Sequence, residues 1–160
     1  MTTQPDTCAD ATPESVWHTI VAAYARADIE GVIRHLAPDA ILRSSIDGVA
    51  FPEAGTSVGH DQTRLRFQTM FANFEMLRFE IVSMRSDHVL TESSVAISIK
   101  HRQTGEVLNT QLWFICEFRD GLCHRVDEFI ELDGVNTYLR TIGRDPVEPS
   151  GQPDRDYDYD

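Results

Sequence analysis

The sequence predicts an α+β domain in which helices cover one face of a curved antiparallel sheet. Apolar residues recur at helical spacing in the first half of the chain. From Arg78 to Leu132 the composition is that of strands, interrupted only by turn residues. A series of helices followed by a series of strands places the helices on one side of a single sheet. The length of 160 residues suits one compact domain.

Two helices open the predicted domain. Thr12 can cap the first helix, and Pro13 suits its first position. An apolar stripe carries this helix to about Ala27, and its members are Val16, Trp17, Ile20, Val21 and Tyr24. Asp28 caps a second, shorter helix, which Pro38 ends.

A strand, a loop and a third helix follow. Residues 40–45 are predicted as a short strand, and residues 47–59 carry the glycines and prolines of a loop. The third helix is expected from about Asp61, with an apolar side formed by Phe67, Met70, Phe71 and Phe74. Four long antiparallel strands come next, with turns at 86–88, 103–105 and 120–121, and Asp133 opens a last short helix.

The predicted domain spans residues 12–143. Residues 1–11 are expected to be a flexible N-terminus, and residues 144–160 a flexible acidic tail. Prolines and dense acidic residues leave this tail little apolar surface to offset the entropy cost of ordering it. The segment from Met1 to Asp10 lacks the basic and apolar regions of a secretory signal, so a cytoplasmic location is expected.

Charge and cysteine content argue against several kinds of partner. The net charge of −12 repels phosphate backbones and anionic membranes, and no apolar run approaches the ~20 residues of a membrane-spanning helix. We therefore expect neither nucleic-acid binding nor membrane binding. Cys8, Cys116 and Cys123 fit no zinc-binding spacing and are expected to be free thiols. No other residues have metal-ligand spacing, so neither a metal nor a cofactor is predicted.

Several short motifs resemble those of SnoaL-like members of the NTF2-like superfamily. They are AYARADIEGVIRHLAPDA at 23–40, the G-x-D helix start at 59–61, TG at 104–105, FRDG at 118–121 and EFIE at 128–131. The resemblance covers about residues 14–142 and implies a cone-shaped barrel with three N-terminal helices over a pocket. This superfamily includes ketosteroid isomerases, epoxide hydrolases, dehydratases, polyketide cyclases and non-enzymes, so the function depends on the pocket residues.

Strand alternation identifies inward-facing residues independently of the resemblance. A four-residue loop at 102–105 pairs Val95 with Leu112, and a three-residue loop at 119–121 pairs Leu112 with Glu128. Together with the first strand, this register predicts a pocket lined by Leu42, Ile97, Thr110, Leu112, Phe114, Cys116, His124, Val126 and Ile130.

Glu128 is the charged exception on the apolar inner face. Burial there raises the pKa of a carboxyl group, so Glu128 is predicted to accept and donate protons near neutral pH. Two alternatives remain. A register shifted by one residue places Glu128 in water, and a helix residue can also pair with it structurally.

Three further residues are candidates for the site or its surroundings. By position, Tyr24 resembles a catalytic tyrosine of the scytalone dehydratase branch, and a plain core tyrosine is the alternative. Ser44 stands where the isomerase branch has its catalytic Asp, and its hydroxyl can hold a ligand oxygen but cannot act as the base. His101 faces inward near the end of the sheet and is expected at the pocket rim.

The comparison with each branch finds few of its usual catalytic partners. The oxyanion-hole positions of the isomerases fall on Ile20 and Cys116, which argues against the isomerase mechanism. The Arg and Asp of the epoxide hydrolases fall on Val95 and Ile97, and the Asp that follows the scytalone dehydratase tyrosine falls on Ala25.

Two functions follow from this pattern. The first is a cofactor-free enzyme of the cyclase, isomerase or dehydratase type, in which Glu128 acts as general base and acid on an apolar carbonyl compound. Tyr24 and Ser44 would hold the substrate oxygen. The second is a non-catalytic module that binds a hydrophobic metabolite or serves a dimeric protein interaction. A homodimer is expected through the outer sheet face, which carries Gln111, Trp113, Ile115 and Phe129.

Overall fold

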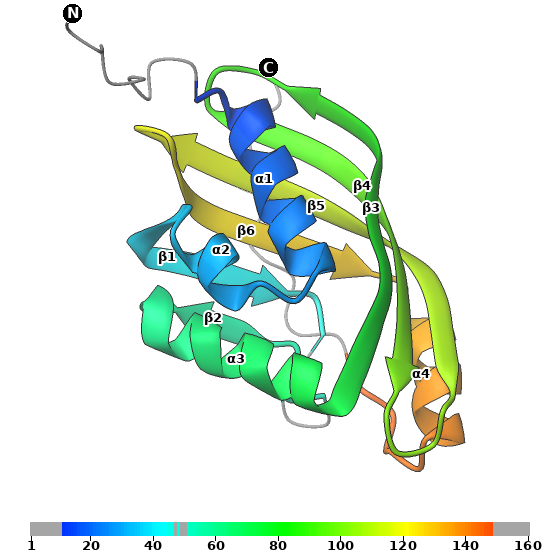
Figure 1. The fold of residues 1–160 in the computed structure, drawn as a ribbon. Helices are drawn as coiled ribbons and strands as arrows, with labels where there is room; N and C mark the ends of the chain where they lie inside the picture. Colours follow the sequence, from blue (N-terminus) through cyan, green and yellow to red (C-terminus); the bar gives the residue numbers. More distant parts are fainter. Residues whose placement is uncertain (1–10, 47, 49–50, 149–160) are drawn as a thin grey trace, which may run out of the picture.

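The computed structural model describes residues 11–46, 48 and 51–148. This part of the chain forms four helices and six strands (Figure 1). The elements are α1 (Pro13–Ala25), α2 (Ile29–Ile33), β1 (Leu36–Ser44), β2 (Thr56–Val58), α3 (Gly59–Asn73), β3 (Phe74–Ser86), β4 (Leu90–His101), β5 (Val107–Arg119), β6 (Leu122–Ile130) and α4 (Leu132–Thr141).

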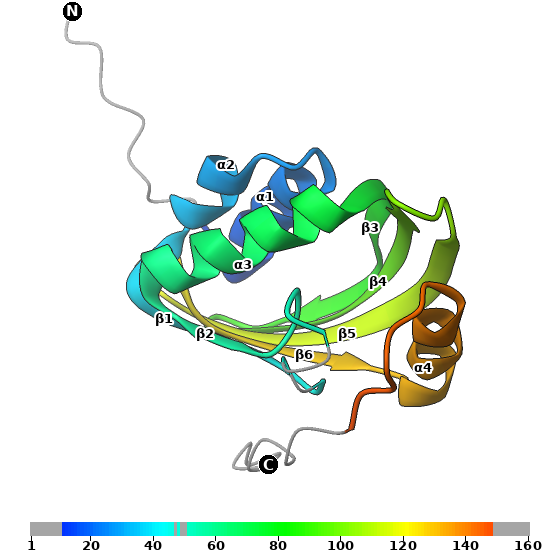
Figure 2. The same ribbon diagram turned by 90° about the horizontal axis from the view of Figure 1, so that it is seen from below.

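The strands form one curved sheet in the order β2-β1-β6-β5-β4-β3. The sheet is not closed, since β2 and β3 are its edges. Helix α3 follows β2 and precedes β3 directly, so it connects the two edges and lies with α1 and α2 on the concave side (Figure 2). The predicted α+β class and helix-covered sheet are confirmed. One difference is that β1 runs parallel to β6, so the sheet is mixed.

The starts of α1 and α2 predicted from the sequence are confirmed, whereas α3 begins at Gly59 and α4 at Leu132, slightly before the predicted starts. The backbone N–H of Ser15 donates to Oγ1 of Thr12 at 3.1 Å, and the N–H of Gly31 donates to the carboxylate of Asp28 at 2.9 Å. Both caps satisfy N–H groups that have no partner within the helix. Side chains therefore fix where α1 and α2 begin.

The second helix and the first strand differ from the prediction. Helix α2 ends at Ile33, and β1 begins at Leu36, so Pro38 lies inside the strand instead of ending a helix. Its place coincides with an interruption of the β1–β6 pairing between Leu36 and Ile41. Proline fits such an interruption because it has no N–H to donate.

The hairpin between β4 and β5 has the predicted register, and the hairpin between β5 and β6 does not. In the latter, Asp120 and Gly121 form a two-residue turn with φ of 53° and 76°. A bulge follows between β5 and β6, with His124 as the extra residue, so Glu128 pairs with Phe114 and not with Leu112. The pairing is shifted by two residues, which preserves the face of every side chain. Glu128 therefore still faces inward.

The chain packs against the domain beyond the predicted boundary at residue 143. Val147 is buried, and its N–H and C=O both bond to the side chain of Asn136. Part of the predicted tail, residues 144–148, thus contacts the domain, while most of both predicted flexible ends lies outside the described residues. Within the described ranges, none of the helices is long and apolar enough to cross a bilayer.

Candidate functional site

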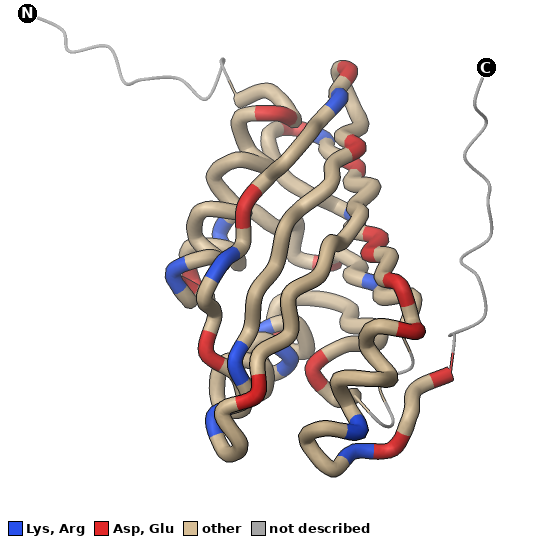
Figure 3. Tube along the Cα trace, turned by 90° about the vertical axis from the view of Figure 1, so that its right-hand side faces the viewer, with Lys and Arg blue, Asp and Glu red and all other residues tan. Residues whose placement is uncertain are grey.

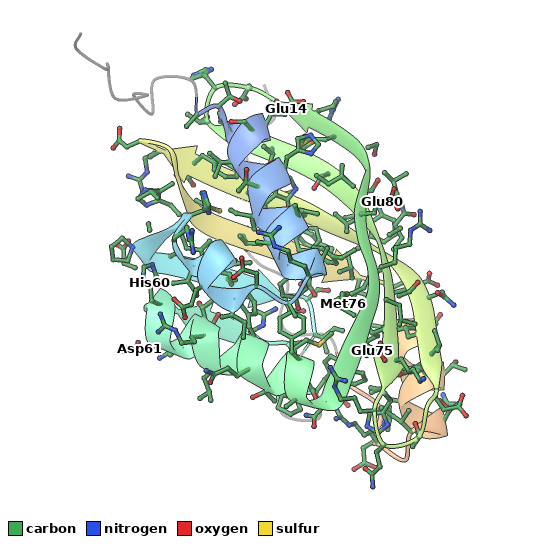
Figure 4. All side chains as sticks on the ribbon, in the orientation of Figure 1. Glu14, His60, Asp61, Glu75, Met76 and Glu80 are labelled. Atoms are coloured by element: carbon green, nitrogen blue, oxygen red, sulfur yellow. The ribbon has the colours of Figure 1, made fainter. Side chains whose placement is uncertain are left out.

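A cavity of about 90 Å³ lies between the concave face of the sheet and α1–α3. Side chains from the helices and the strands fill the rest of this interior (Figure 4). The walls are mainly apolar, and seven of the predicted pocket residues line them: Leu42, Ile97, Thr110, Leu112, Phe114, Val126 and Ile130. Phe51 and Ala54, from the segment before β2, close one side.

Glu128 lies in this cavity with 19% of its side chain exposed. Parallel pairing of β1 with β6 places Ser44 opposite Glu128, and Oγ of Ser44 donates to Oε1 at 3.4 Å. The N–H of Ser45 also donates to the backbone oxygen of Glu128 at 2.8 Å, which fixes this end of β6. The alternative of a solvent-exposed Glu128 is excluded.

Burial raises the pKa of the Glu128 carboxyl group above its usual value. The positive charge of Arg66 and the hydrogen bond from Ser44 act in the opposite direction, but burial is the larger effect. The environment of Glu128 therefore favours the protonated form more than water does, and a carboxyl group in this state can both accept and donate a proton.

Arg66 is the main charged partner of Glu128 and was not among the predicted site residues. One guanidinium Nη lies 3.7 Å from Oε2 of Glu128, and 11% of the Arg66 side chain is exposed. Its Nε donates to the backbone oxygen of Glu53 and its other Nη to that of Gly55, both at 3.2 Å. The segment before β2 thus holds the guanidinium in place. The second alternative for Glu128, in which it pairs with a helix residue, is therefore partly correct, because Arg66 of α3 contacts its carboxylate.

The spacing of the apolar residues along α3 could have indicated from the sequence that Arg66 faces inward. Thr63, Phe67 and Met70 are buried at positions i, i+4 and i+7 of the helix. Arg66 occupies position i+3, so it belongs to the same inward stripe. A charged residue within an apolar stripe is the feature that could have identified it.

Tyr24 belongs both to the core and to the cavity wall. Its ring packs against Phe67, Phe71 and Phe79 with centroid distances of 5.1, 5.0 and 4.7 Å. Burial raises the pKa of Tyr24 strongly, the carboxylate of Glu128 raises it further, and Arg66 opposes them. The phenol therefore keeps its proton and can serve as a hydrogen-bond donor.

Three predicted residues do not line the cavity. Cys116 is fully buried and packs beside Cys123; both are free thiols, as expected, whereas Cys8 lies outside the described residues. His124 is the bulge residue, and its Nδ1 lies 3.4 Å from the guanidinium of Arg119. His101 is 6% exposed and bonds through Nδ1 to Thr104 at 2.9 Å, so it is a core residue and not part of a rim. The predicted register did not contain the bulge at His124. This is why His124 was expected in the cavity wall, although it does not line the cavity.

Metal-ligand clusters are absent from the described residues, since no three His, Cys, Asp or Glu side chains there are grouped closely enough to hold an ion. The polar groups near Glu128 are one guanidinium and two hydroxyl groups, from Arg66, Ser44 and Tyr24. The cavity is also lined by Thr110 and by two charged residues that have partners of their own, Glu53 with Arg144 and Arg43 with Asp127. Glu128 and the groups near it can move protons and donate hydrogen bonds.

The model of the SnoaL-like domain matches residues 17–126 of the chain. The chain belongs to the SnoaL-like family. The matched span of this SnoaL-like protein includes Tyr24, Ser44 and Arg66 but ends two residues before Glu128. The family match therefore says nothing about the role of the Glu128 carboxylate. No curated protein matches the chain in sequence.

Solved structures similar to this SnoaL-like chain share its fold. An NTF2-like protein of unknown function from Burkholderia pseudomallei is 18% identical, with a TM-score of 0.70 over 81% of this chain and 96% of that one. A putative polyketide cyclase from Xanthomonas campestris is 12% identical, with a TM-score of 0.65 over 79% and 95%. An LEH-like epoxide hydrolase from M. tuberculosis is 13% identical, with a TM-score of 0.63 over 79% and 87%. The three neighbours establish the fold alone.

Proposed function

We propose that this SnoaL-like protein binds a small apolar carbonyl compound and that Glu128 removes and returns a proton beside the carbonyl group. The observation that carries this proposal is a carboxyl group of raised pKa in an apolar cavity, next to hydrogen-bond donors from Arg66, Ser44 and Tyr24. Fold neighbours named as a putative polyketide cyclase and an LEH-like epoxide hydrolase are consistent with small-molecule chemistry in such a cavity.

The proposed proton transfers follow from the positions of these groups. Ionised Glu128 takes a proton from the carbon next to the carbonyl, and the electron pair of that C–H bond moves toward the carbonyl oxygen to give an enolate. Arg66 and Tyr24 donate hydrogen bonds to this oxygen as its charge grows. Protonated Glu128 then returns the proton to another carbon in an isomerisation, or to a departing hydroxyl group in a dehydration.

The cavity volume limits the size of the proposed substrate. Pockets for drug-sized ligands measure roughly 300–1,000 Å³. A cavity of about 90 Å³ favours a compound with few heavy atoms, and a substrate with several rings would require side chains to move. We therefore propose a small cyclic or branched carbonyl compound.

Proton exchange into a simple ketone tests this function. Cyclohexanone in D₂O is expected to gain deuterium next to its carbonyl faster with the protein than with buffer alone, as measured by NMR. Glu128 is the base when ionised, so the enzymatic rate should rise with pH through the raised pKa of its carboxyl group and then level off. Exchange no faster than in buffer at any pH would contradict the proposed chemistry for small ketones.

A second candidate function is a non-catalytic binding module. The contact between Arg66 and Glu128 and the small cavity favour it, since a carboxylate paired with a guanidinium is a weaker base. In that case the same cavity holds a hydrophobic metabolite. Binding of a ketone without exchange would favour this function over the enzyme.

We also propose that the outer sheet face forms a homodimer interface. Trp113 is 46% exposed and pairs across β5–β6 with Phe129, while Ile115 and Gln111 are half-buried beside it. The row of Trp113 is uncharged, because its cross-strand neighbours are Ser94 on β4 and Phe129 on β6, whereas Ile115 lies between Glu92 and Asp127. Figure 3 shows long stretches of the chain without Lys, Arg, Asp or Glu. Large apolar patches of this kind are typical of protein interfaces.

Changing Trp113 to Arg is expected to shift this dimer toward monomer, because it places a charge at the centre of the apolar face. Sedimentation velocity of the wild-type chain and the variant measures the change. Val82→Arg on the edge strand β3, where Val82 is 58% exposed, serves as control. A wild-type chain that sediments as a monomer at all concentrations would overturn the dimer.

A further inference from the structure

The charge of Arg66 is neutralised incompletely inside the cavity. Its Nε and one Nη bond to the backbone oxygens of Glu53 and Gly55, which orient the guanidinium but carry no net charge. The remaining Nη lies 3.7 Å from Oε2 of Glu128, longer than the ~2.7–2.9 Å of a charge-assisted hydrogen bond. Arginine does not lose its proton in proteins. Compensation of this cation within the cavity therefore depends on the charge state of Glu128.

The other groups that face Glu128 do not supply a second anion. Tyr24 from α1 stays protonated, Ser44 from β1 is a neutral hydroxyl donor, and β5 presents the uncharged side chain of Phe114 as the pairing neighbour. Glu53, from the segment before β2, lines the cavity, but both of its oxygens are bound by Arg144. Arg43 of β1 also lines the cavity, but its Nε lies 3.6 Å from the carboxylate of Asp127. When Glu128 takes up a proton, Arg66 is thus the cation of the cavity whose charge is not balanced by a paired carboxylate.

We propose that the cavity binds apolar molecules carrying one oxyanion, such as a small carboxylate or an enolate, with uptake of one proton by Glu128. Arg66 then pairs with the bound oxyanion, and protonated Glu128, Ser44 and Tyr24 present O–H donors around it. Ionised Glu128 repels the same ligand, since two anions would share one buried cation. A neutral ligand of equal shape lacks this attraction.

This inference deepens the proposed function and rests on the same site. In the proposed reaction, the substrate becomes an enolate when Glu128 takes its proton. At that point the cavity holds an anionic ligand beside a neutral Glu128, and a bound carboxylate beside protonated Glu128 has the same charges. A stable carboxylate reproduces that arrangement without any reaction. Binding therefore tests the inference separately from turnover.

The experiment measures binding of benzoate by calorimetry between pH 5 and 8, in pairs of buffers that differ in ionisation enthalpy. Benzamide, which has nearly the same shape and no charge, is the matched ligand. Benzoate is expected to bind with uptake of about one proton where free Glu128 is ionised, and its affinity should then fall about tenfold per pH unit. Benzamide affinity should not change with pH.

Two variants separate the roles of the cation and the carboxyl group. Glu128→Gln should still bind benzoate, without proton uptake and without dependence on pH, because the amide is neutral throughout. Arg66→Met should lose at least tenfold in benzoate affinity and little in benzamide affinity. Arg64→Met, on an exposed face of α3, should behave as the wild-type chain, since Arg64 pairs with Glu30 and Asp61 at the surface.

Several outcomes would overturn the inference. They are equal affinity for benzoate and benzamide, benzoate binding without proton uptake, no binding of either ligand, or a folded Arg66→Met that binds benzoate normally. If Arg66→Met does not fold, the proton count of wild type and Glu128→Gln decides alone. Ketone exchange without benzoate binding would remove this inference and keep the proposed function, and the reverse result would keep the anion site and remove the catalysis.

Discussion

Replacing Glu128 with Gln is expected to slow proton exchange into cyclohexanone by a factor of about 10²–10⁴, the usual contribution of a general base. The amide keeps the shape of the side chain and its contact with Ser44 but cannot take the proton. The pH dependence of exchange should disappear with it. NMR of deuterium incorporation in D₂O measures both effects.

Glu117→Gln is the matched control for this experiment. Glu117 lies on the neighbouring strand β5, 39% exposed, and pairs with Arg119 at 3.7 Å away from the cavity. It should leave the exchange rate unchanged. An equal rate in wild type and Glu128→Gln would remove Glu128 from the chemistry, while loss in both variants would indicate a general effect of reduced charge.

The orientation of Glu128 could be predicted from the sequence, but its pairing partner could not. The predicted three-residue loop and the observed two-residue turn plus bulge differ by two residues in register, and an even shift preserves the face of each strand residue. The two-residue turn alone would have turned Glu128 outward. The extra residue, His124, restores the parity, and no turn motif marks its position.

The partners of Glu128 depend on contacts between segments distant in the sequence. Ser44 meets Glu128 because β1 runs parallel to β6, and strand order across a sheet leaves no local sequence signal. Arg66 reaches the carboxylate because α3 spans the open side of the sheet between its two edge strands. Only the helical spacing of Arg66 with Thr63, Phe67 and Met70 marks it as inward-facing. Local patterns therefore predicted the elements, while the assembly of the site needed the tertiary structure.

The segment that holds Arg66 depends in turn on a buried ion pair, and Arg144→Met is expected to destabilise the protein strongly. The Glu53 side chain has 0% of its surface exposed and accepts two hydrogen bonds from Arg144 and one from Asn73, each at 2.9 Å. The Arg144 guanidinium also lies about 5.5 Å from the rings of Phe51 and Phe74. Removing one partner of a buried pair costs about 3–5 kcal/mol, because the other charge stays buried without compensation. For a chain of this size, the unfolding midpoint should fall by about 6–20 °C.

Thermal unfolding of two further variants distinguishes this effect from the simple loss of an arginine. Arg78→Met removes an exposed pair with Glu80, which projects from β3 in Figure 4, and should leave the midpoint nearly unchanged. Adding Glu53→Gln to Arg144→Met should recover much of the lost stability, since the neutral amide no longer buries a charge and still accepts a hydrogen bond from Asn73. If Arg144→Met unfolds within about 2 °C of the wild-type chain, the pair does not hold this segment. In that case the backbone oxygens that orient Arg66 must be fixed by other contacts, and Arg144→Met should leave benzoate binding unchanged.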